Sequence, residues 1–437
     1  MQRVPAQSHT DWVYTDKGAT MDQQKRGFSY QWQVLIWLSM AIFIHQSGRA
    51  ILGVTVPQVK VDLGLSDSQV GFASTCLYWV LACMIPISGF LGDRVSRKWI
   101  ITWTLIVGSA ATGLAGVSVG LLTLILFYSV TSGSCEALYS PPAFSLLAAY
   151  HKKTRSLAMA IHQCGLYLGV LSSGFVAGKI ADIWGWRPTF WIYGGAGVLL
   201  GIIFIRVLRD APRDPHQETV PVREPLLASV RVLVRIKSVL LVTGGFMALV
   251  FVNNAFQLWA PSFVQEKFNL TMAQAGGGVM FYHNLAAMIS AVLIGYLTDR
   301  TVCRDPKFRL KMQACGLLLG APIVLLISRV DTLSHMWLMV ALYGIFRGFF
   351  DCNTFSSLYD VVPAKYHATA SGLMMMTAFI VGSFSPWMLG RLSDVYGRDA
   401  GMNIGFIVLA VVFVLGAVCM IAAHLLTFAK DHVIEEA

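Results

Sequence analysis

Long apolar runs separated by short polar segments are the dominant pattern of this sequence. Each run is close to the roughly 20 residues that a helix needs to cross a hydrocarbon core about 30 Å thick. The runs are continuous rather than alternating with period two, and they contain Gly and Pro, which membrane helices tolerate. We therefore predict an all-α integral membrane protein with twelve transmembrane helices, near residues 32–56, 70–92, 99–119, 121–149, 156–180, 188–208, 239–262, 275–298, 312–328, 335–360, 367–391 and 402–428.

Composition and charge agree with a membrane protein. Hydrophobic residues make up 56% of the 437 residues and charged residues only 13%, which is too apolar for a soluble fold. If the N-terminus is cytoplasmic, the segments on that side carry 24 of the 33 Lys and Arg residues, the opposite segments carry seven, and the spans carry two. This asymmetry predicts cytoplasmic termini in a plasma (inner) membrane, and it explains the net charge of +10 without a nucleic-acid partner.

Other sequence signals are weak. Residues 1–30 lack an apolar core followed by a cleavage site, so we expect no removable signal peptide. The eight cysteines are scattered, mostly within spans and without a C-x-x-C pair, which favours packing roles over disulfides or a metal site. We also find no phosphate-binding G-x-x-x-x-G-K-[ST] loop, and we expect no cofactor.

The longest polar interruption, residues 209–237, divides the predicted spans into two sets of six. A linker of this length allows two bundles to move relative to each other. The predicted organisation is therefore a cytoplasmic tail, an N-terminal bundle, a cytoplasmic linker, a C-terminal bundle and a C-terminal tail, at residues 1–30, 31–208, 209–237, 238–428 and 429–437.

Two internal repeats support this division into pseudo-symmetric halves. GFLGDRVSRK at residue 89 is echoed by GYLTDRTVCR at 295, each at the end of the second span of its half. GKIADIWGWRP at 178 is echoed by GRLSDVYGRDA at 390, each at the end of a fifth span. Parallel six-helix repeats are one of the known plans of transporters.

The first repeat resembles the signature loop of the major facilitator superfamily, and the resemblance covers nearly the whole chain. The Arg49 segment, SCEALYSPP at 134–142 and GWRPTF at 185–190 are similar to the anion:cation symporter family and to spinster-like lipid transporters. Both groups usually have Asp before this arginine, whereas Gly48 stands here, which puts the usual Asp-based coupling in doubt.

The charged loop at 89–98 is interpreted as a gate. Asp93 can bind nearby arginines or cap a helix of the other half, while Gly89 permits close helix approach. The resemblance implies the same latch for an outward-facing state; the alternative is that the cations only set topology. The predicted gating residues are Gly89, Asp93, Arg94, Arg97, Asp299 and Arg300.

Charged groups within a span cost about 2.5–3.5 kcal/mol each, so they are expected to face a cavity or a partner. Arg49 has no carboxylate within its own helical turn and needs either Glu136 or an anionic substrate; Arg347 and Asp351, by contrast, could neutralise each other. We predict that Glu136 and Asp351 couple protons, although Glu136 could instead be a structural hydrogen-bonding group. The predicted substrate-binding residues are Arg49, His45, Gln46, Tyr139, His162, Gln163, Tyr167, Asn254, Gln257, Tyr282, His283 and Arg347.

Packing is the alternative role for the histidines in this set, and contacts between helices are the alternative for the Asn and Gln side chains. A guanidinium fits carboxylate, phosphate or sulfate well. We therefore predict a monomeric secondary transporter of a small organic anion, coupled to protons. The alternatives are a spinster-like exporter of lysolipids or other amphipaths and a non-transporting membrane sensor; no motif favours an enzyme.

Overall fold

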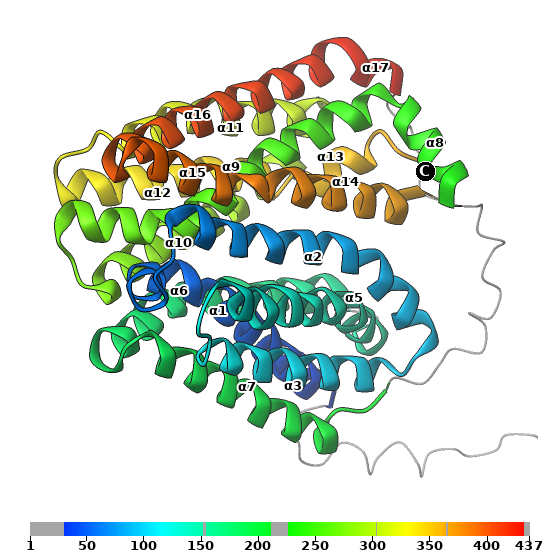
Figure 1. Cartoon of the computed structure of the whole chain (residues 1–437). Helices are drawn as coiled ribbons and strands as arrows, with labels where there is room; N and C mark the ends of the chain where they lie inside the picture. The colour runs from blue at the N-terminus through cyan, green and yellow to red at the C-terminus, as the bar shows by residue number, and fades with distance from the viewer. Residues whose placement is uncertain (1–29, 152–153, 211–225, 303, 364–365, 432–437) are drawn as a thin grey trace, which may run out of the picture.

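The computed structural model describes residues 30–151, 154–210, 226–302, 304–363 and 366–431, and at some helical positions only the backbone. The chain forms two helical bundles, one above the other in Figure 1, with the first half below and the second half above. The first half comprises α1 (Tyr30–Leu63), α2 (Asp67–Arg94), α3 (Arg97–Ala115), α4 (Leu121–Leu124), a π-helical stretch (Ile125–Ser132), α5 (Gly133–Tyr150), α6 (Arg155–Trp184) and α7 (Trp186–Val207).

The second half repeats this layout after one short helix. It comprises α8 (Leu226–Arg235), α9 (Lys237–Phe268), α10 (Met272–Val302), α11 (Phe308–Ile327), α12 (Leu333–Asp351), α13 (Thr354–Tyr359), α14 (His367–Gly382), α15 (Phe384–Tyr396), α16 (Arg398–Ala422), a second π-helical stretch (Ala423–Thr427) and α17 (Phe428–Asp431). Helix α8 lies inside the predicted linker 209–237, where its apolar positions recur at helical spacing and Leu233 is buried.

The all-helical prediction is confirmed for the part of the chain that the structure describes, which contains no strand. Eleven helical segments are long and apolar enough to span a membrane, so this is a multi-pass membrane protein. The segment predicted at 99–119 is not among the eleven. It forms α3, which has Arg97 and Lys98 in its first turn and contains several Gly, Ser and Thr residues, and these lower its hydropathy.

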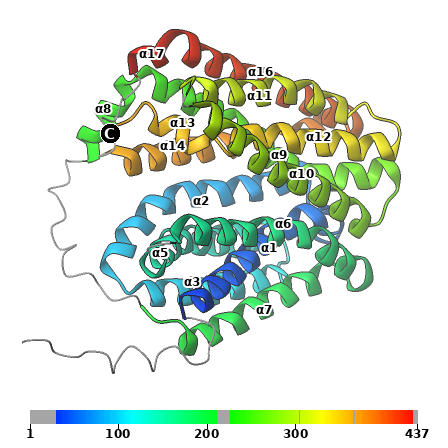
Figure 2. The ribbon, with the colours of Figure 1, turned by 180° about the vertical axis from the view of Figure 1, so that it is seen from behind.

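The two halves touch along one face, which we call the closed face: the side on which α1 ends and α2 begins, at the left in Figure 1. Here the first turns of α2 lie against α15 (Figure 1), whereas α14 lies against α2 farther from this face (Figure 1 and Figure 2). A side chain at Gly71 would meet the backbone of Pro386, and one at Gly174 would meet the backbone of Gly276. Glycine at these positions therefore allows helices of opposite halves to approach backbone to backbone.

Candidate functional site

The first charged cluster lies where α1 meets α5. Arg49 Nη1 donates to Glu136 Oε1 at 2.9 Å, and Arg49 Nη2 donates to Gln46 Oε1 at 2.5 Å. Gln46 Nε2 donates to the same Glu136 oxygen at 2.9 Å, which closes a ring of three side chains. Arg49 and Gln46 are neighbours because they are one turn apart on α1.

Glu136 reaches this ring from a helix with an irregular start. The π-helical stretch Ile125–Ser132 precedes α5, and π-helical segments change the phase of the residues that follow. In the same region, the Tyr128 hydroxyl donates to the backbone oxygen of Arg49 at 2.8 Å. The span that carries Glu136 is therefore attached to α1 by both an ion pair and a hydrogen bond.

The second cluster belongs to the other half. On α12, Arg347 Nε lies 3.0 Å from Asp351 Oδ2, one turn along the same helix. Arg347 Nη1 lies 2.9 Å from His283 Nε2 of α10. A guanidinium only donates, so His283 Nε2 is the acceptor and the imidazole proton sits on Nδ1. His283 is fully buried, with its ring 4.6 Å from that of Tyr343.

The two clusters lie in opposite halves of the chain, one on α1 and α5 and the other on α12 and α10. Between 9% and 20% of each charged side chain remains exposed, so both pairs are only partly buried.

Other predicted site residues are placed differently. Tyr139 is fully buried in the N-terminal bundle, where its hydroxyl donates to the Leu38 backbone oxygen at 2.8 Å. His45 and His162 pack on its ring, with centroids 4.9 and 6.3 Å away. Tyr282 is 40% exposed and stacks on Trp337. The part that these four residues play in binding stays a prediction.

The remaining predicted substrate residues lie on α6 and α9. Gln163 is exposed and Asn254 is buried, with its Nδ2 unpartnered among the described side chains. The backbone oxygen of Gln257 lies where α9 crosses α1 at Gly53. Their role in binding stays a prediction.

The predicted gate is only partly described. The side chains of Asp93 and Arg94 and the surroundings of Gly89 lie outside the described part of the structure, and Arg97 begins α3. In the second half, Asp299 Oδ1 lies 4.0 Å from Arg309, and the Arg300 guanidinium lies 4.5 Å from the centre of the Tyr296 ring. The gating role of this loop stays a prediction.

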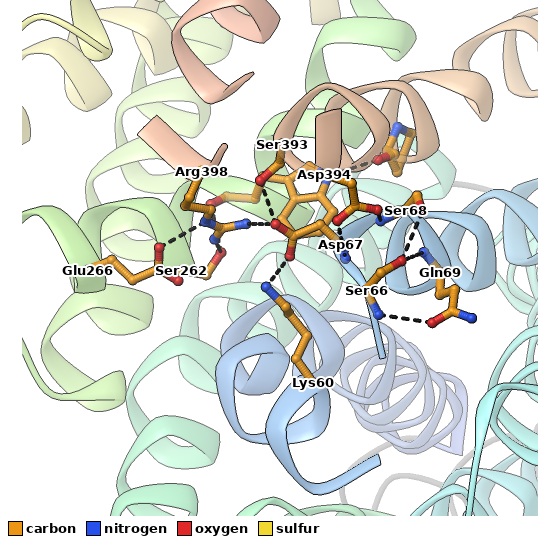
Figure 3. A network of polar contacts seen from close by, with 12 residues as sticks. Lys60, Ser66, Asp67, Ser68, Gln69, Ser262, Glu266, Ser393, Asp394 and Arg398 are labelled. Atoms are coloured by element: carbon orange, nitrogen blue, oxygen red, sulfur yellow. Dashed lines mark hydrogen bonds and ion pairs between the residues drawn. The ribbon is translucent and has the colours of Figure 1, made fainter. Parts of the chain in front are cut away.

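Sequence reasoning missed a polar network on the closed face, shown in Figure 3. Asp67, at the start of α2, pairs with Lys60 and accepts from Arg398 Nη1 of the other half at 3.0 Å. Arg398 also donates to Glu266 and to Ser262, at 2.8 Å each. The only sequence signal for this network is the position of these charged residues at the ends of predicted spans.

Within the described ranges there is no group of three or more His, Cys, Asp or Glu side chains that could hold a metal ion.

Comparison with known proteins gives a consistent assignment. The model of the Major Facilitator Superfamily matches residues 38–386. "Protein spinster homolog 1" of Bos taurus is 26% identical over 389 residues, covering 82% of this chain and 72% of that protein. The "Probable galactarate/D-glucarate transporter GarP" of Escherichia coli (strain K12) is 23% identical over 417 residues, covering 88% and 93%.

The solved structures agree on the fold. A bacterial homologue of the human lysosomal transporter Spinster, in an inward-facing and occupied conformation, superposes with a TM-score of 0.83 at 19% identity, covering 94% of this chain and all of that one. The family model spans most of the chain, and the two bundles match those of this transporter. The chain therefore belongs to the Major Facilitator Superfamily and is a membrane transporter, not an enzyme.

Proposed function

We propose that this chain is a secondary active transporter that carries a small organic anion, such as a sugar acid, by alternating access in symport with protons. The observation that carries the proposal is the ring of Arg49, Glu136 and Gln46 within the membrane. The guanidinium of Arg49 suits a ligand that carries a carboxylate. In the ring it is paired with one carboxylate, that of Glu136, which a proton can neutralise.

The coupling follows from charge balance. Arg49 and Arg347 are matched by Glu136 and Asp351, so the charges of the two clusters balance. A proton on Glu136 would remove the partner of Arg49, and an anionic substrate would replace that lost negative charge. One proton and one monovalent anion would therefore enter together without leaving an uncompensated charge in the membrane.

Arg347 would form the second side of the same site. It is held by Asp351 on its own helix and by His283 on a neighbouring helix. Because Arg49 belongs to the N-terminal half and Arg347 to the C-terminal half, a ligand between the arginines would touch both bundles. Binding energy could then act on the movement of one bundle against the other.

The conformation of the structure fits the inward-facing state of such a transport cycle. The positive-inside prediction puts the closed face on the outer side of the membrane, which would make this an inward-facing state. The similarity to a relative solved in an inward-facing conformation supports this orientation.

A lipid or amphipath exporter is the second candidate. The spinster homologue of Bos taurus is as similar in sequence as the galactarate/D-glucarate transporter, and the spinster-like bacterial structure superposes over almost the whole chain. The intramembrane arginines favour the anion carrier, since a lysolipid would have to place a phosphate in the same site.

Uptake into proteoliposomes tests both candidates. The purified protein is reconstituted with an acidic exterior and a neutral interior, and uptake of labelled galactarate, glucuronate, glucose and lysophosphatidylcholine is compared. We expect gradient-dependent uptake of a sugar acid that is lost in Arg49→Ala. Equal uptake with and without the gradient would remove proton coupling, and movement of the lysolipid alone would support the exporter.

A further inference from the structure

The second repeat, at 178 and 390, contains two aspartates that occupy matching positions in the structure. Asp182, in the last turn of α6, accepts hydrogen bonds from the backbone N–H groups of Met272 at 2.9 Å and Ala273 at 3.0 Å. These two amides begin α10, which belongs to the other half. Asp182 is therefore an N-terminal cap supplied across the bundle interface.

Asp394 repeats this arrangement in the opposite direction. Near the end of α15, it accepts from the backbone N–H groups of Asp67 at 3.0 Å and Ser68 at 2.9 Å. These amides begin α2 of the N-terminal half, as Figure 3 shows. In each half, then, the fifth span supplies the carboxylate that caps the second span of its partner.

Close packing brings each carboxylate within reach. A β-carbon at Gly178 would lie 2.6 Å from the Cα of Ala273, and one at Gly390 would meet the backbone of Asp67. Each of these glycines stands four residues before its aspartate, hence on the same helix face. Both interfaces thus combine a glycine contact with a charged cap at the first turn of the facing helix.

The two caps differ in what surrounds them. On the Asp394 side, Ser393 Oγ donates to Asp67 Oδ2 at 2.5 Å, and Arg398 and Lys60 pair with the same carboxylate. Met272 occupies the corresponding first position of α10 and offers no charge. The symmetric element is therefore the pair of caps, and the ionic network is an addition on one side.

We propose that Asp182 and Asp394 form a reciprocal double latch that holds the closed face shut and releases as one unit. A carboxylate at a helix N-terminus is stabilised by two N–H donors and by the helix dipole. When one bundle rocks as a rigid body, α2 leaves α15 while α10 leaves α6, so both caps break in the same motion. The latch deepens the proposed function, because it links opening of this face to the transport cycle.

Amide hydrogen–deuterium exchange of the full-length protein in nanodiscs, without any substrate, tests the latch. Peptides covering residues 64–72 and 270–277 report the capped amides of α2 and α10. We expect Asp182→Ala to raise exchange about tenfold at its own helix, α10, and also at α2, whose cap it leaves intact. Asp394→Ala should give the mirror result.

Two further variants serve as controls. Asp331→Ala changes an exposed aspartate in the connection after α11 and should leave both peptides unchanged. Asp182→Asn keeps an oxygen acceptor, so it should fall between the native protein and Asp182→Ala, and it replaces the alanine variant if that one does not fold.

Faster exchange confined to the helix whose own cap was removed, or no change at either helix, would overturn the double latch. Because no substrate or proton gradient enters the measurement, this outcome is separate from a failure of the proposed function. Reciprocal exchange with no sugar-acid uptake would leave the latch standing and reject only the anion-symport proposal.

Discussion

The two charged clusters pair an arginine with a carboxylate by different means. In the first half, Arg49 of α1 binds Glu136 of α5, and Gln46 bridges the two side chains. In the second half, Arg347 and Asp351 lie one turn apart on α12, and His283 binds only the arginine. The first pair therefore joins two helices, whereas the second is contained within one.

This difference suggests a division of roles. Losing the Glu136 charge would loosen α1 from α5 and free the guanidinium, so protonation there has a structural consequence. Losing the Asp351 charge would leave α12 intact and Arg347 still bound to His283. On the proposed function, we therefore expect the first cluster to anchor the anion and couple the proton, and the second cluster to orient the substrate.

Removing each arginine gives the largest expected difference. Arg49→Ala removes the proposed anchor of the anion and leaves Glu136 with only Gln46. Breaking a buried ion pair in this way also costs about 3–5 kcal/mol of folding free energy. We expect sugar-acid binding to fall more than about 100-fold in Arg49→Ala and about tenfold in Arg347→Ala. Isothermal titration with glucuronate measures both values, and equal losses would contradict the assigned roles.

The next comparison neutralises the carboxylates. Glu136→Gln mimics the protonated state, so we expect gradient-driven uptake to fall by about 10- to 100-fold while substrate exchange across the membrane continues. Asp351→Asn should reduce both activities by a similar, smaller factor. Proteoliposome uptake and counterflow measure the two quantities, and a Glu136→Gln protein that still responds to the gradient would place the proton elsewhere.

The neutral partners of the arginines sharpen the contrast. Gln46→Leu and His283→Phe each remove a hydrogen-bond acceptor from a guanidinium, at an expected cost of about 1–3 kcal/mol in unfolding free energy. Only Gln46 also touches the carboxylate, so only Gln46→Leu should move the pH midpoint of transport. A shifted midpoint in His283→Phe would mean that the second cluster titrates too.

Two buried tyrosines give the smallest expected difference. The Tyr139 hydroxyl donates to the Leu38 backbone oxygen, whereas the fully buried Tyr343 hydroxyl has no partner among the described residues. Tyr139→Phe should lower the free energy of unfolding by about 1 kcal/mol, and Tyr343→Phe should leave it unchanged or raise it. Thermal or denaturant unfolding of the two variants decides, and equal losses would argue against this hydrogen-bond assignment.

The sequence predicted the membrane fold because about 20 apolar residues per span are a requirement of the bilayer itself. It also singled out Arg49, Glu136, Arg347 and Asp351, since intramembrane charges are few and costly. Partner choice was left open for Arg49, because residues 87 positions apart carry no mark of their contact. By contrast, the spacing of four residues between Arg347 and Asp351 was enough to predict that they could pair on one helix.

Tyr139, His45 and His162 show where pattern reasoning stops. Their polar groups and span positions suit a binding site, and in the structure they pack against one another inside one bundle, a contact that the sequence did not reveal; their role in binding stays a prediction. A polar side chain in a span satisfies the same constraint whether it meets a ligand or a neighbouring side chain. The rotation of the helix about its axis decides whether the side chain meets a ligand or a neighbour, and that rotation is set by packing.

By itself, the sequence determined an all-helical membrane transporter built from two related halves, because hydropathy and repeats are local properties of the chain. Tertiary structure alone decided which face is closed and which groups hold it closed. Asp182 and Asp394 stood in a repeat recognisable from sequence, but the amides they cap lie at the starts of α10 and α2 in the opposite half. Backbone donors have no signature in a sequence, so that pairing appears only when the bundles are assembled.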